Sequence, residues 1–176
     1  MKNFFSLLAA ALSFPAGAAL SVGDQAPDFS TEASLGGKPY TYSLAAALKE
    51  GPVVLYFYPA AFTSGCTVEA HNFAAAMDQY KALGASVIGI SNDSMETLNK
   101  FSVSECRSKF PVASDSTQSI MKAYDAVLLW KTSYASRTSY VIAPNGRIVY
   151  AYSAMSPDQH VSNTLAAVRA WAATNK

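Results

Sequence analysis

The sequence predicts a three-layer α/β domain with a mixed central sheet, and three observations support this class. The run 53–58 is continuously apolar and rich in β-branched and aromatic residues, as in a strand covered on both faces. Apolar residues then repeat at helical spacing through 66–82, and a second apolar run follows at 85–90. Strand, helix and strand in this order form a parallel crossover, which places a helix against a sheet.

Two hairpins are expected to extend this sheet. Gly36-Gly37 lies in the middle of residues 28–42 and predicts a small N-terminal β-hairpin. Pro144-Asn145-Gly146 is a strong turn signal between the β-rich runs 138–142 and 147–152. The second hairpin is antiparallel, so the predicted sheet is mixed.

Three further helices and one extended piece complete the domain. Pro disfavours helix in the residue before it, which indicates an extended segment around Pro111. The expected elements are a helix from Asp93 or Ser94 to about Cys106, an extended piece at 110–113, a short helix at 116–124 and a final helix at about 157–173.

The first residues resemble a secretory leader. Lys2 precedes an apolar run at 4–12, and Ala16-Gly17-Ala18 offers a small-residue cleavage site. The apolar run is too short to span a membrane with confidence. We therefore expect a signal peptide at 1–18, a single domain at 19–176 and an exported, periplasmic protein. An uncleaved anchor is the alternative for the first residues.

Charge and histidine spacing exclude several classes of function. The net charge of +1, with no basic or acidic block, gives no electrostatic support for binding nucleic acid or a membrane surface. His71 and His160 lack metal-ligand spacing, so no metal and no cofactor are expected. The chain has two cysteines, and in an exported protein such a pair can form a structural disulfide.

Cys66 has the surroundings of a reactive thiol. It follows a short Gly/Ser/Thr loop after the strand at 53–58 and opens the helix expected at 66–82. Free backbone N–H groups and the positive end of the helix dipole favour a thiolate at such a position. The thiolate is the nucleophilic form of cysteine.

The pattern Pro59-x-x-x-Thr63-x-x-Cys66 resembles the active-site signature of the peroxiredoxins. The longer segment 62–71 is similar to the peroxiredoxin Q branch, also called bacterioferritin comigratory protein, of the alkyl hydroperoxide reductase/thiol-specific antioxidant superfamily. The resemblance extends from about Gly23 to about Ala173. It implies a thioredoxin-like fold and a thiol-dependent peroxidase that reduces hydrogen peroxide and small organic hydroperoxides through a cysteine sulfenic acid.

The resemblance also assigns roles to individual residues. Cys66 is the peroxidatic cysteine, and Thr63 is expected to fold its hydroxyl back toward the sulfur, where it can donate one hydrogen bond and accept one. Pro59 fixes the entry of the loop. Arg137 occupies the family position of an arginine before a late strand, where a permanently charged guanidinium stabilises the thiolate. Glu69 either orients neighbouring groups or is a solvated acid in the first turn.

Cys106 is the possible resolving cysteine. The branch often places that residue five positions after the peroxidatic cysteine, but His71 stands there in this chain. Other members carry it in the helix that corresponds to 94–108, which implies a Cys66–Cys106 disulfide in each cycle. An unreactive core thiol and a permanent structural bridge are the alternatives.

Two other functions remain open from the sequence. One is a thioredoxin-like disulfide exchanger, although the chain has no Cys-x-x-Cys motif. The other is a non-enzymatic thioredoxin-fold binding module with a structural disulfide. For the peroxidase, the expected partners are a peroxide and a thioredoxin-like or small-thiol reductant, and the expected state is a monomer or weak homodimer. Trp130 is expected in an exposed loop.

Overall fold

The computed structural model describes residues 20–175, and the expected signal peptide at 1–18 lies outside this part of the chain. Within these residues, seven strands form one mixed sheet in the order β2-β1-β5-β4-β3-β6-β7. The strands are β1 (Ser30–Leu35), β2 (Lys38–Ser43), β3 (Val53–Phe57), β4 (Ser86–Ser91), β5 (Val112–Ser114), β6 (Thr138–Ile142) and β7 (Ile148–Ser153).

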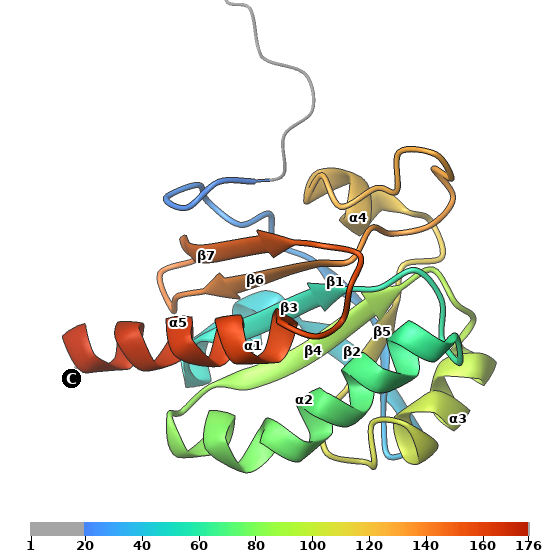
Figure 1. Ribbon diagram of the computed structural model, residues 1–176, viewed down its shortest axis with the longest axis horizontal. Coiled ribbons are helices and arrows are strands. Elements are labelled where there is room, and N and C mark those ends of the chain that lie inside the picture. Colours follow the sequence, from blue (N-terminus) through green and yellow to red (C-terminus); the bar gives the residue numbers. More distant parts are fainter. Residues whose placement is uncertain (1–19, 176) are drawn as a thin grey trace, which may run out of the picture.

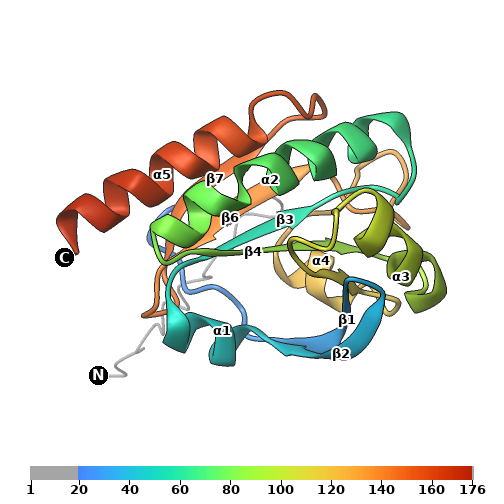
Figure 2. The same cartoon turned by 90° about the horizontal axis from the view of Figure 1, so that it is seen from below.

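Helices cover both faces of this sheet (Figure 1; Figure 2). Helices α2, α3 and α5 pack on one face, and the shorter α1 and α4 pack on the other. Their bounds are α1 (Leu44–Glu50), α2 (Ser64–Ala82), α3 (Met95–Ser104), α4 (Ser119–Ala123) and α5 (His160–Thr174). The predicted three-layer domain, with β1 and β2 as an N-terminal hairpin, is confirmed.

Strand β3 is the centre of the sheet. All five of its residues are buried, and it pairs in parallel with β4 and antiparallel with β6. Its side chains alternate between two apolar clusters: Val54 and Tyr56 face the one beneath α2, and Val53, Leu55 and Phe57 face the one beneath α1 and α4. The continuous apolar run therefore reflects burial on both faces.

Helix α2 begins at Ser64, two residues before the predicted start at 66. Thr63 has the extended backbone of an N-cap residue, and the first backbone bond of the helix runs from the N–H of Thr67 to the carbonyl of Thr63 at 2.9 Å. Cys66 therefore lies inside the first turn rather than opening the helix. Buried apolar residues such as Phe73 and Tyr80 hold one face of α2 against the sheet.

Helix α1 is absent from the expected elements. Only Leu44 and Leu48 of its seven residues are buried, so its apolar pattern is too short to stand out. The sequence feature that marks the start of α1 is its N-cap residue, Ser43. The side-chain oxygen of Ser43 accepts a hydrogen bond from the N–H of Ala46.

Helices α4 and α5 each begin three residues later than predicted, although their positions in the chain are right. The backbone of Gln118 is left-handed, with φ of 60°. A right-handed helix cannot continue through such a residue, so α4 begins only after Gln118. Before α5, the side chains of Ser156 and Asp158 bond to each other at 2.7 Å, and residues 155–159 form turns and bends. No helix within residues 20–175 is long and apolar enough to cross a membrane.

Gly89 of β4 is required by its neighbour Tyr56. A Cβ atom at position 89 would lie 2.6 Å from the Tyr56 ring, which is buried and stacked on Phe73 at 4.4 Å. We expect Gly89→Ala to lower the free energy of unfolding by about 1–3 kcal/mol, because the ring has no room to move. Denaturant unfolding measures this, with Ser86→Ala as the control at an exposed position of the same strand. Equal stability of the two variants would show that the ring is free to shift.

Candidate active site

The loop between β3 and α2 is held from two sides. At its start, the N–H of Tyr58 donates to the carbonyl of Ile90 at 3.1 Å, and half-buried Pro59 follows. Further along, the N–H of Ala61 donates to the carboxylate of Asp93 at 2.7 Å. Phe62 has a left-handed backbone, with φ of 64°, which turns the chain into the N-cap of α2. The loop therefore has a fixed path between the sheet and the helix.

The Thr63 side chain is oriented differently from the prediction. Its hydroxyl donates to the carbonyl of Ala60 at 2.8 Å and is exposed at the mouth of the loop, rather than donating to the sulfur of Cys66. The hydroxyl proton of Thr63 is therefore already used in a hydrogen bond within the loop. The lone pairs of its oxygen remain able to accept a hydrogen bond from a bound molecule.

Cys66 is buried in the first turn of α2, with 2% of its surface exposed. The backbone N–H groups of Gly65 and Cys66 belong to the helix positions that have no partner within the helix. Together with the helix dipole, these groups favour negative charge beside the sulfur. The prediction that Cys66 lies at a helix N-terminus is confirmed.

Arg137 lies just before β6 and connects three parts of the site. Its Nη2 donates to the sulfur of Cys66 at 3.4 Å, its Nη1 donates to the carboxylate of Glu69, and its Nε donates to the carbonyl of Met155 at 2.9 Å. Gly65 makes room for it, since a Cβ atom there would lie 3.0 Å from Nη2. The guanidinium is buried, and it faces the sulfur as expected.

Glu69 is buried completely, so the solvated-acid interpretation is wrong. It lies three residues after Cys66 and therefore on the same face of α2, where one carboxylate oxygen binds Arg137. Burial raises the pKa of Glu69 above its ordinary value, and the charge of Arg137 opposes this rise. Its other oxygen, Oε1, has no hydrogen-bond partner.

His160, which the sequence left without a role, lies beside that oxygen. Its Nδ1 is 3.7 Å from Glu69 Oε1 and 2.8 Å from the hydroxyl of Ser139, and its Nε2 is 2.9 Å from the carbonyl of Ala154. Ser139 of β6 is two residues after Arg137, so the two side chains point to the same side of extended backbone, which is a weak sequence signal for this cluster. No group of three or more His, Cys, Asp or Glu side chains within 20–175 is placed to hold a metal ion.

Cys106 lies in the turn after α3, in the same apolar cluster as Cys66, and both cysteines are free. It is fully buried, and burial raises the pKa of its thiol well above the ordinary value. The next two residues, Arg107 and Ser108, both have left-handed backbones. The preceding residue, Glu105, pairs with His71 of α2 at 2.8 Å. In this state the two cysteines do not form a structural bridge.

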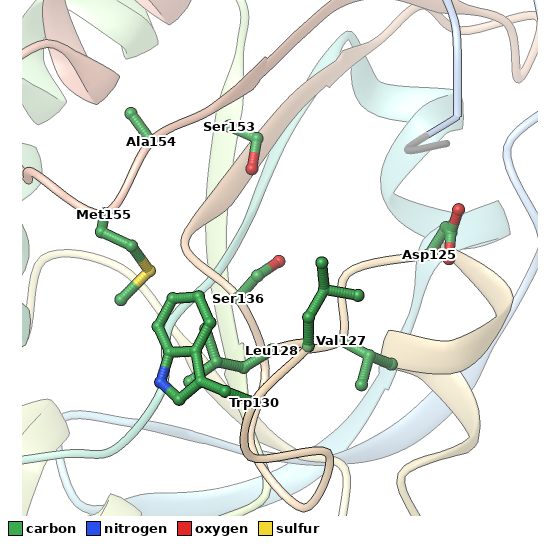
Figure 3. Close-up of a pocket in the computed structure, with 9 residues that line it drawn as sticks. Asp125, Val127, Leu128, Trp130, Ser136, Ser153, Ala154 and Met155 are labelled. Carbon is green, nitrogen blue, oxygen red and sulfur yellow. The ribbon is translucent and has the colours of Figure 1, made fainter. Parts of the chain in front are cut away.

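An apolar hollow of about 400 Å³ lies beside the segment that anchors Arg137 (Figure 3). Met155, whose carbonyl accepts from the arginine, lines the hollow together with residues of the loop at 127–130. Trp130 and Leu129 of that loop are 74% and 88% exposed. The prediction of an exposed Trp130 is confirmed.

Comparison with known proteins gives a consistent result. Residues 22–151 match the AhpC/TSA family. A peroxiredoxin Bcp of Xanthomonas campestris is 31% identical over 126 residues, which are 68% of this chain and 78% of the relative. A chloroplastic peroxiredoxin Q of Sedum lineare is 33% identical over 130 residues, 73% of this chain and 68% of the relative.

The fold agrees with that of solved relatives. The crystal structure of peroxidoxin BcpB from Mycobacterium tuberculosis superposes with a TM-score of 0.74 at 34% identity, covering 85% of this chain and 96% of that one. The predicted thioredoxin-like α/β fold is therefore confirmed.

The geometry predicts that Cys66 is the more reactive of the two thiols, because its sulfur lies 3.4 Å from Arg137 Nη2. We expect Arg137→Ala to slow alkylation of Cys66 by iodoacetamide at neutral pH by at least about tenfold, because the thiolate loses its cation. Arg137→Lys should restore part of the rate, since the charge returns without the planar fork. Mass spectrometry of the alkylated peptide gives the rate in protein shown to be folded by circular dichroism. Arg169→Ala, at an exposed arginine of α5, is the control. An unchanged alkylation rate in Arg137→Ala would show that the guanidinium does not contribute to the reactivity of the Cys66 sulfur.

Proposed function

Because the chain belongs to the AhpC/TSA family and is a thiol-dependent peroxidase, we propose that Cys66 is the cysteine that attacks the peroxide. One observation carries this assignment: the sulfur of Cys66, at the N-terminus of α2, lies 3.4 Å from the Nη2 of buried Arg137. The disulfide-exchanger and binding-module alternatives are not favoured, because the relatives are peroxiredoxins.

The chemistry follows from this arrangement. The Cys66 thiolate attacks one peroxide oxygen, a sulfur–oxygen bond forms, and the oxygen–oxygen bond breaks. The sulfur is oxidised to a sulfenic acid, and the departing oxygen takes up a proton and leaves as water or an alcohol. Arg137 donates to the charge that builds on the sulfur and the oxygens. The free lone pairs of Thr63 accept the peroxide O–H, and Pro59 keeps the loop that carries Thr63 in place.

We propose that Cys106 then resolves the sulfenic acid. Its thiol condenses with the oxidised Cys66, which forms one disulfide and releases one water. A thioredoxin-like or small-thiol reductant returns both residues to thiols. The proposed substrates are hydrogen peroxide and small organic hydroperoxides, and the proposed working state is a monomer or weak homodimer.

Disulfide formation requires the end of α3 to open. The Cα atoms of a disulfide lie within about 7 Å. Here Cys66 is buried in the first turn of α2, Cys106 is buried in the turn after α3, and both thiols are free. Arg107 and Ser108 have left-handed backbones in the turn after α3. Each such conformation raises the free energy of the folded turn by roughly 1–2 kcal/mol. Local unwinding of this turn and of the first turn of α2 brings the two sulfurs together.

A count of thiols after one equivalent of hydrogen peroxide tests this cycle. Wild type should lose both thiols and give a Cys66–Cys106 linked peptide. Cys106→Ser should lose one thiol at an unchanged rate, keep the sulfenic acid, and accumulate sulfinic acid with more peroxide. Cys66→Ser, the matched control, should keep its one remaining thiol, that of Cys106.

The opposite results have separate meanings. If wild type gives no linked peptide and Cys106→Ser turns over normally with added thiol, the protein is a one-cysteine peroxidase and Cys106 is core. If Cys66 keeps its thiol, the assignment of the attacking residue fails.

We also propose export to the periplasm, on the basis of Lys2, the apolar run at 4–12 and the small residues before Ala19. Cleavage after Ala18 would leave a mature chain that begins at Ala19. Mass spectrometry of the protein from its native host measures the N-terminus. A mature protein that retains Met1 would overturn the periplasmic assignment.

A further inference from the structure

The buried cluster behind the sulfur has two groups that can carry a negative charge, Cys66 and Glu69, and one cation, Arg137. If Cys66 and Glu69 were both ionised, two negative charges would face the single positive charge of Arg137, out of contact with water. An uncompensated buried charge is costly, so one further proton in the cluster would stabilise the thiolate.

The structure offers one place for that proton. Glu69 Oε1 is buried without a hydrogen-bond partner and lies 3.7 Å from His160 Nδ1. The carbonyl of Ala154 can only accept, so His160 Nε2 carries a hydrogen and Nδ1 is the imidazole atom left to titrate. Two acceptors that face each other repel, whereas a proton on either one makes the contact attractive.

We propose that Glu69 and His160 act as one positioning pair that holds a single proton between them in the reactive enzyme, and so leaves the charge of Arg137 to the Cys66 thiolate. The inference rests on the proposed role of Cys66. Loss of the proton to solvent makes Glu69 an anion that competes with the sulfur for the guanidinium. The reaction with peroxide should then slow.

Other polar groups around the pair do not supply this proton. Ser139 and the Tyr152 ring face His160, and Arg137 binds both Glu69 and Cys66. Burial, together with the nearby carboxylate of Glu69, raises the pKa of the Tyr56 hydroxyl. A serine hydroxyl does not titrate in the working range, and a guanidinium stays charged. Burial raises the pKa of Glu69 and lowers that of His160, so the shared proton is placed on the carboxyl side.

The pH dependence of Cys66 oxidation by hydrogen peroxide tests the pair. In wild type, the rate should fall by about tenfold as the pH rises through the raised pKa of Glu69, about 8, because the new anion competes with the sulfur for Arg137. A tenfold change corresponds to about one pKa unit of interaction between the two groups. In Glu69→Gln, whose amide is always neutral and can still accept from Arg137, the fall at high pH should disappear. His71→Asn, at the only other histidine, should keep the wild-type profile.

His160→Gln separates proton sharing from a structural role. Its amide can still donate to the Ala154 carbonyl, but the Nδ1 acceptor is gone. In otherwise wild-type protein, the fall in rate should move to lower pH. In the Glu69→Gln background, His160→Gln should leave the position of the profile unchanged, because no shared proton remains.

Three results distinguish the possibilities. The proposed pair would be overturned if the rate of Cys66 oxidation still fell at high pH in Glu69→Gln. It would also be overturned if His160→Gln shifted the pH profile of that rate equally in both backgrounds. If His160→Gln does not fold, the comparison of wild type with Glu69→Gln still tests whether Glu69 carries the proton, and a fall that persists in Glu69→Gln overturns the pair. If peroxide leaves Cys66 unoxidised in wild type, the proposed function fails instead.

Discussion

The buried guanidinium of Arg137 is the interaction on which the geometry of the site depends. A charge removed from water is tolerated only where nearby groups neutralise it and accept its hydrogen bonds. Its acceptors are the sulfur of Cys66, the carboxylate of Glu69 and the carbonyl of Met155, so one side chain fixes α2 against β6 and the segment after β7. Gly65 is part of the same constraint, because a larger residue would push the guanidinium away. The thiolate is thus stabilised by a group that the fold cannot easily move.

The two cysteines are embedded in regions of different rigidity. Around Cys66, the capped helix and Arg137 favour one fixed arrangement. Around Cys106, the chain leaves α3 through two left-handed residues, Arg107 and Ser108, at the end of a ten-residue helix. A peroxidase that forms an internal disulfide needs both properties, since the first step requires an ordered pocket and the second requires a turn that opens at low cost.

Local sequence signals predicted most of the fold but only part of the site. The apolar run 53–58 and the loop after it predicted the central strand and the position of Cys66. Arg137 was identified by its resemblance to the family position of an arginine before a late strand. Glu69 and His160 are polar residues on helices, and spacing alone assigns such residues to solvent. Their burial depends on how α2 and α5 pack against β6, which is a tertiary property that no single segment encodes.

The most direct test of the central role of Arg137 is the rate of Cys66 oxidation by hydrogen peroxide, measured by rapid mixing under single-turnover conditions in wild type, Arg137→Lys and Arg137→Ala. A well-aimed donor in a preorganised site contributes on the order of 10²–10³ in rate, so Arg137→Ala should be slower by that factor, with Arg137→Lys between the two. Oxidation of Arg137→Ala at the wild-type rate would contradict the claim that the guanidinium activates the sulfur.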